Sequence, residues 1–80
     1  MADVRIDEGL WSMGMSPEGI LEAWRCPNGS MVRAGMSLAD VRIEDALHEV
    51  LAPADGRLTI LAGRNAVVEP GIVIGLISPS

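Results

Sequence analysis

The sequence predicts a small all-β domain, a flattened eight-stranded barrel or sandwich made of two four-stranded halves. Three observations favour this fold class: turn-forming residues recur at short intervals, the apolar runs between them are short, and one spacing pattern occurs twice. The chain has 80 residues, which we take as one domain over 1–80. A chain of this size buries only about 60–65% of the surface exposed by its unfolded form, so its small aliphatic side chains must pack well.

Alternating apolar runs separated by turn residues define the expected strands. We expect them at 2–6, 20–24, 30–32, 37–43, 47–51, 57–61, 67–68 and 72–77. Within 37–43, alternation places Leu38 on one face with Asp40 and Arg42, and the intervening residues on the other. The segment 43–51 is also compatible with a short helix, because Glu, Asp, Ala, Leu and His all occur in helices.

One pattern of apolar residues around a glycine occurs twice. The two sets, offset by 36 residues, are Val32, Gly35, Leu38 and Val41, and then Val68, Gly71, Ile74 and Ile77. Upstream, Gly19 and Leu21 are echoed by Gly56 and Leu58 at an offset of 37. Neither half could bury an apolar face alone, so we expect two halves related by a pseudo-twofold axis and packed on each other.

Composition and charge exclude several classes of function. The net charge of −5 disfavours nucleic acid and anionic membranes as partners, and the longest apolar run, 71–77, is far shorter than the ~20 residues of a membrane helix. The N-terminal residues lack a signal-peptide pattern, so the expected location is cytoplasmic. Cys26 has no disulfide partner, and His48 has no paired nucleophile or zinc-like spacing, so we expect neither an enzyme nor a metal site.

Four short motifs follow one another in register over residues 18–77. They are Glu18-Gly19-Ile20-Leu21-Glu22-Ala23-Trp24, then Gly29 with Val32 and Gly35, then Pro53-Ala54-Asp55-Gly56, and last Val68-Glu69-Pro70-Gly71 with Val73, Ile74 and Leu76. Together they resemble the biotinyl/lipoyl-attachment domains. The resemblance implies the barrel-sandwich hybrid fold of that family. It is closer to the lipoyl branch, because the biotinyl pattern with Met on both sides of the modified lysine fits less well.

The resemblance also places the residue that would carry the cofactor. In lipoyl domains a hairpin turn reads roughly D-K-A, and the count from Gly35 puts Glu44, Asp45 and Ala46 at these positions. All six basic residues of the chain are arginines, and a carboxylate cannot form the amide that holds lipoate or biotin. We therefore expect no cofactor on this chain. The resemblance further assigns Glu49 to a position where lipoyl domains commonly carry an acidic residue read by their ligase.

The hairpin turn 44–46 and the apolar loop 9–17 are the candidate partner-binding segments. Glu44 and Asp45, with Asp40 and Glu49 nearby on the hairpin, could offer an acidic tip to a basic partner, although Asp is also a good turn residue that tolerates the left-handed conformation. The resemblance implies that the loop lies beside this turn and helps partner enzymes to choose their carrier. The loop's Trp11, Met13 and Met15 would then lie near Asp45 and bind a partner; alternatively, Trp11 covers the core.

These observations predict an unmodified, carrier-like interaction module. We expect it to dock on a 2-oxoacid dehydrogenase, acyltransferase or carboxylase assembly, or on a cofactor ligase. The alternative is a lipoyl carrier, or less readily a biotin carrier, whose attachment lysine has been lost or altered. A half-motif from a membrane-fusion adaptor is a third interpretation, but such proteins carry long helical hairpins and this sequence has no segment long enough for one.

Overall fold

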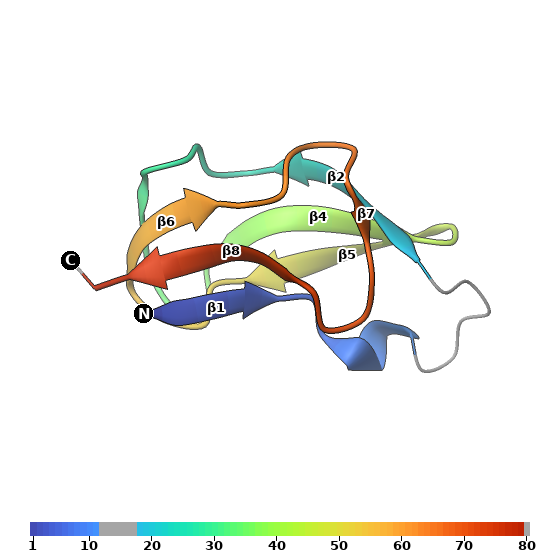
Figure 1. The fold of residues 1–80 in the computed structure, drawn as a ribbon, viewed down its shortest axis with the longest axis horizontal. Coiled ribbons are helices and arrows are strands. Elements are labelled where there is room, and N and C mark those ends of the chain that lie inside the picture. The colour runs from blue at the N-terminus through green and yellow to red at the C-terminus, as the bar shows by residue number, and fades with distance from the viewer. Residues whose placement is uncertain (12–17, 80) are drawn as a thin grey trace.

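Eight strands and one short 3-10 helix make up the computed structural model, which describes residues 1–11 and 18–79, with only the backbone of Leu10 and Trp11 (Figure 1). In chain order they are β1 (Ala2–Arg5), η1 (Glu8–Trp11), β2 (Gly19–Trp24), β3 (Met31–Val32), β4 (Ser37–Ile43), β5 (Ala46–Leu51), β6 (Gly56–Ile60), β7 (Val67–Val68) and β8 (Val73–Ser78). Each strand expected from the sequence is present, with its ends shifted by at most one residue.

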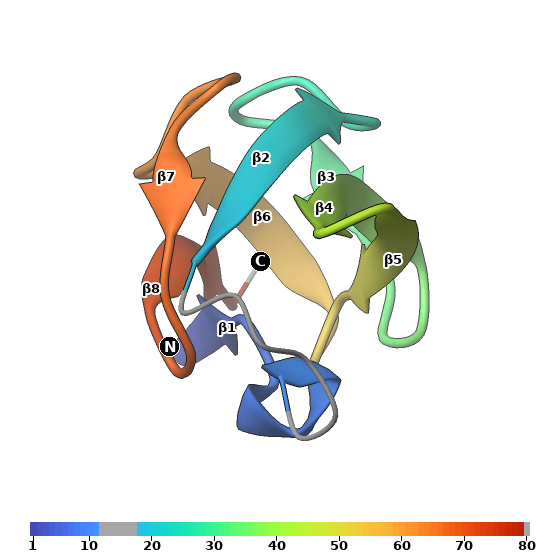
Figure 2. The same cartoon turned by 90° about the vertical axis from the view of Figure 1, so that its right-hand side faces the viewer.

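The strands form two antiparallel four-stranded sheets, so the predicted all-β barrel-sandwich architecture is confirmed. The strand order is β1-β8-β6-β3 in one sheet and β5-β4-β2-β7 in the other. Viewed along the long axis of the molecule, the strands of both sheets surround one shared interior (Figure 2). The two orders correspond strand for strand, as the pseudo-twofold axis requires, but each sheet takes strands from both halves of the chain. The two halves of the sequence are therefore interleaved.

The repeated apolar residues form the centre of the core. None of them is more than 3% exposed: Leu21, Val32, Leu38, Val41, Leu58, Val68, Ile74 and Ile77. Each fully buried side chain of this kind contributes about 1.5–3 kcal/mol relative to an exposed one. The sequence repeat thus records the positions at which both halves point side chains into the shared interior.

Two details of the strands differ from the sequence-based expectations. Leu38 was expected beside Asp40 and Arg42, but it is buried together with the next residue, Ala39. A register shift between Ser37 and Ala39 in the β4–β5 ladder interrupts the alternation, as a β-bulge does. The short helix considered for 43–51 is wrong, because residues 46–51 pair with β4 as strand β5.

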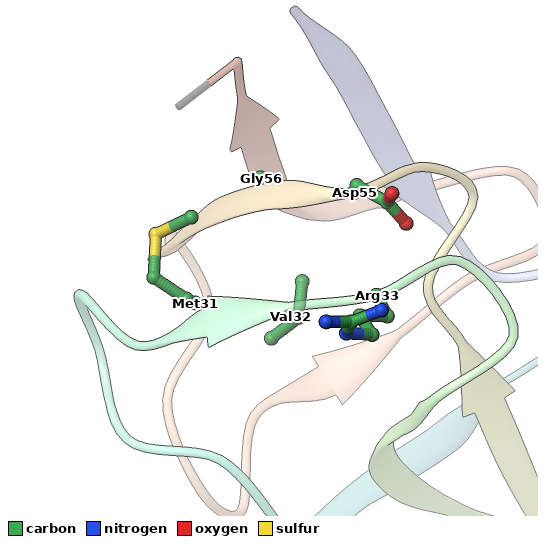
Figure 3. A pocket seen from close by; sticks show the side chains of 5 residues that line it. All are labelled: Met31, Val32, Arg33, Asp55 and Gly56. Atoms are coloured by element: carbon green, nitrogen blue, oxygen red, sulfur yellow. The ribbon is translucent and has the colours of Figure 1, made fainter.

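The Pro53-Ala54-Asp55-Gly56 segment fixes the end of the barrel at which β1 begins and β8 ends. Asp55 Oδ1 accepts a hydrogen bond of 2.7 Å from the backbone N–H of Ala34. Gly56 has φ +150°, and a Cβ atom there would lie 2.1 Å from the carbonyl oxygen of Ser78. Figure 3 shows the shallow hollow between β3 and β6, lined by Met31, Val32, Arg33, Asp55 and Gly56. This segment thus joins the turn before β4 and the end of β8, and we call it the clamp. It lies at the opposite end of the barrel from the β4–β5 turn.

Candidate functional site

The turn between β4 and β5 projects from the other end of the barrel (Figure 1). Glu44 and Asp45 form this two-residue turn, closed by the pairing of Ile43 with Ala46, and both side chains are exposed. Asp45 was noted as a residue type that tolerates the left-handed conformation, but it is Glu44 that has a positive φ, of 57°. Two-residue hairpins need positive φ at their first or at both central positions, because only such turns match the twist of the strands.

Arg42 connects the turn electrostatically to the neighbouring strand β2. Its Nε donates a hydrogen bond to Oε1 of Glu22, and the two side chains form an ion pair across the sheet. The hydrogen bond and the negative charge of Glu22 raise the pKa of Arg42 above its usual value, and the negative charge of Asp45 acts in the same direction. The carboxylate of Asp45 therefore lies within electrostatic reach of a guanidinium on the face of the sheet.

Glu49 does not belong to the tip. It pairs with Asp40 three ladder positions beyond the closing pair, which at about 3.4 Å per residue is roughly 10 Å along the strands. Asp40 is engaged by Arg25, whose Nη2 lies 3.0 Å from its Oδ1. Glu49 instead lines a hollow between the end of β1 and β5, together with Arg5 and Asp7. The structure thus keeps Glu44 and Asp45 together and separates Glu49 from them.

The apolar loop 9–17 falls only partly within the described residues. Its first residues belong to helix η1, where a loop was expected, and η1 lies toward the same end of the barrel as the β4–β5 turn (Figures 1 and 2). Met13 and Met15 lie outside the described residues, as does the side chain of Trp11. Their expected proximity to Asp45 stays a prediction.

The arrangement of the strands matches that of a domain whose structure has been solved. The solution NMR structure of the lipoyl domain of the 2-oxoglutarate dehydrogenase complex from Azotobacter vinelandii superposes with a TM-score of 0.72. The chain has the lipoyl-domain fold. The match covers 94% of this chain and 95% of the other at 22% sequence identity. No protein-family model matches the sequence, and no curated protein matches it either.

The residues at the tip do not fit lipoate, the group that the lipoyl-domain fold suggests. The resemblance puts the attachment position at Asp45, which offers a carboxylate, and the sequence contains no lysine whose ε-amine could be acylated. Among residues 1–11 and 18–79, no group of three His, Cys, Asp or Glu side chains is placed to hold a metal ion. No helix in these described segments has the length and apolar character needed to cross a membrane.

Sequence reasoning missed the residues that surround the tip on the sheet face. Arg42 and Ile20 line a hollow with Glu18, Gly19 and Glu44, so β2 and β4 both contribute to this surface. The available signal was the alternation of β2, in which Ile20 lies between the buried Gly19 and the buried Leu21 and must face outward. Which residues lie beside Ile20 on the neighbouring strands depends on the strand register, and the sequence alone does not reveal that register.

Proposed function

We propose that this chain is a lipoyl-like carrier domain that carries no cofactor and acts as a protein-interaction module. Its partner would be a component of a 2-oxoacid dehydrogenase, acyltransferase or carboxylase assembly, or a cofactor ligase. The observation that supports this best is the pair Glu44 and Asp45 at the exposed tip of an otherwise complete lipoyl-domain fold. The tip is an exposed two-residue turn, and it holds carboxylates in place of an acylatable amine.

The chemistry of the tip favours a basic partner surface. Exposed carboxylates attract cationic groups over about 8–10 Å at physiological ionic strength and raise association rates more than they lower dissociation rates. The domain would transfer no chemical group. It would act as a scaffold, competitor or regulator on the partner surface that a true carrier uses.

Affinity capture with a matched pair of variants tests this function. The tagged wild-type domain is compared with Asp45→Asn and with Asp3→Asn, which removes the same charge from β1 near the other end of the barrel. Mass spectrometry should identify components of a 2-oxoacid dehydrogenase, carboxylase or ligase, and Asp45→Asn should reduce their recovery several-fold while Asp3→Asn does not. Equal recovery with both variants would refute a role for the tip.

A second candidate function is a carrier whose attachment lysine has been lost or altered. The two-residue turn followed by Ala46 favours it, because the resemblance to lipoyl domains places an alanine directly after the attachment position. The variant Asp45→Lys, incubated with lipoate and biotin ligases, separates the two proposals. Acylation detected by intact mass would show that ligase recognition survives, whereas no acylation by either enzyme would favour long divergence toward binding alone.

A further inference from the structure

A row of exposed side chains crosses the outer face of the β5-β4-β2-β7 sheet beside the tip. Leu47 pairs with Arg42, Arg42 with Ile20, and Ile20 with Val67, so the four residues stand side by side, one on each strand. We call Leu47, Arg42, Ile20 and Val67 the outer row. Neighbouring strands lie about 4.8 Å apart, so the outer row is about 14 Å long.

The apolar members of the outer row are exposed to solvent. The exposed fractions are 54% for Leu47, 36% for Ile20 and 53% for Val67. Single exposed apolar side chains are common on any protein, but here three stand in one cross-strand row and form an apolar strip in which Arg42 separates Leu47 from Ile20 and Val67. Such a strip is typical of a surface that another polypeptide covers.

The charges around the outer row define what would cover it. The hollow that contains Ile20 and Arg42 is also lined by Glu18 and Glu44, Glu22 forms the ion pair with Arg42, and Asp45 acts on the same guanidinium. Among the described residues at this surface, four carboxylates thus stand against one guanidinium, a formal net charge of −3.

We propose that the outer row binds a basic, apolar segment of a partner protein, with aliphatic side chains over Leu47, Ile20 and Val67 and an arginine or lysine directed into the hollow between β2 and β4. This inference rests on the proposed docking function and extends the docking surface from the tip onto the face of the sheet.

Other occupants fit this surface less well. A second copy of the chain would bring the same excess of negative charge to the contact, and like charges facing one another cost binding energy. Nucleic acid and anionic membranes are repelled by the net charge of −5. A cationic polypeptide satisfies both the apolar strip and the surrounding carboxylates.

The test uses short synthetic peptides titrated into the ¹⁵N-labelled domain and followed by NMR. The probes are a peptide of alternating arginine and leucine, a glutamate–leucine counterpart and an arginine–serine counterpart. The arginine–leucine peptide should shift the amide signals of the outer row saturably, and the other two should bind at least about fivefold more weakly. Equal binding of the glutamate–leucine peptide would overturn the proposal, because the carboxylates would then not select the partner.

Two variants at positions of similar exposure test whether the peptide binds the outer row specifically or binds any exposed apolar side chain. Leu47→Thr should weaken binding of the arginine–leucine peptide at least about threefold, whereas Met31→Thr, on β3 of the other sheet and 50% exposed, should leave it unchanged. Both variants keep a residue compatible with a strand. Unchanged binding by Leu47→Thr would refute the outer row.

The same spectra show whether only the outer row is refuted or whether the proposed docking function is refuted as well. Shifts confined to Glu44 and Asp45, with the arginine–serine peptide binding equally well, would overturn the outer row while leaving an acidic docking tip. Shifts at neither place would overturn the outer row and would also remove the support for a basic partner at the tip.

Discussion

Replacement of Gly56 by alanine should strongly destabilise this domain. Gly56 has φ +150°, and its Cβ position lies 2.1 Å from the carbonyl oxygen of Ser78 and 2.8 Å from Cγ2 of Ile77. A sparsely populated φ costs about 1–3 kcal/mol for a residue with a side chain, and displacing packed neighbours costs about 1–3 kcal/mol more. Neither neighbour can yield easily, because both belong to β8, which pairs with β6 and β1. Together these costs predict a loss of about 2–6 kcal/mol from the free energy of unfolding, which is about 4–12 kcal/mol for a domain of roughly 80 residues.

Two other glycines provide graded controls for urea unfolding followed by circular dichroism. Gly35 has φ +86° but open space around its Cβ position, so Gly35→Ala should cost only the conformational term, about 1–2 kcal/mol. Gly63 has neither feature, and Gly63→Ala should change the free energy of unfolding by less than about 1 kcal/mol, with stabilisation as the favoured sign. A Gly56→Ala protein no less stable than Gly35→Ala would refute the reasoning, because the contact with β8 would then carry no cost.

Further predictions concern the symmetry of the core and the clamp at Asp55. Leu21→Ala and Leu58→Ala, at equivalent positions and both 0% exposed, should each lower the free energy of unfolding by about 3–4 kcal/mol, and values differing by more than about 2 kcal/mol would contradict their equivalence. Asp55→Ala should cost about 1 kcal/mol by removing the acceptor of the Ala34 N–H, whereas Asp55→Asn, which keeps an oxygen acceptor, should cost less. Thermal unfolding of the two Asp55 variants checks this, and an identical melting temperature for both would argue against the hydrogen bond.

Much of the fold was readable from the sequence because local and global signals agree. Turn residues and alternation located every strand, and the repeat around Gly35 and Gly71 located the core. The bulge at Leu38 was not readable, because alternation alone predicts an uninterrupted strand. The positive φ of Glu44 was also missed, since turn preferences favour Asp for that conformation and the hairpin geometry overrides them.

The candidate site was predictable only in part. Counting from the glycine motifs located Asp45, and the structure puts it at an exposed turn as expected. The distance of Glu49 from that turn follows from the ladder, because three pairs separate it from the closing pair. The outer row needs the register of three separate strand pairs, two of them between strands far apart in the sequence, such as β2 and β7. Long-range register of this kind depends on tertiary packing, which a single sequence does not report.

The pairing of Ala2 with Ile77 has a consequence for protein engineering. The first strand begins beside the end of the last strand, with paired Cα atoms about 5 Å apart, so a short linker could join them and the chain could be reopened elsewhere as a circular permutant. The exposed turn at Arg64 and Asn65 is a suitable opening, because it leaves β4 and β5 covalently continuous. The same proximity allows insertion into a surface loop of a host protein, from which the Glu44–Asp45 turn would point away into solution (Figure 1).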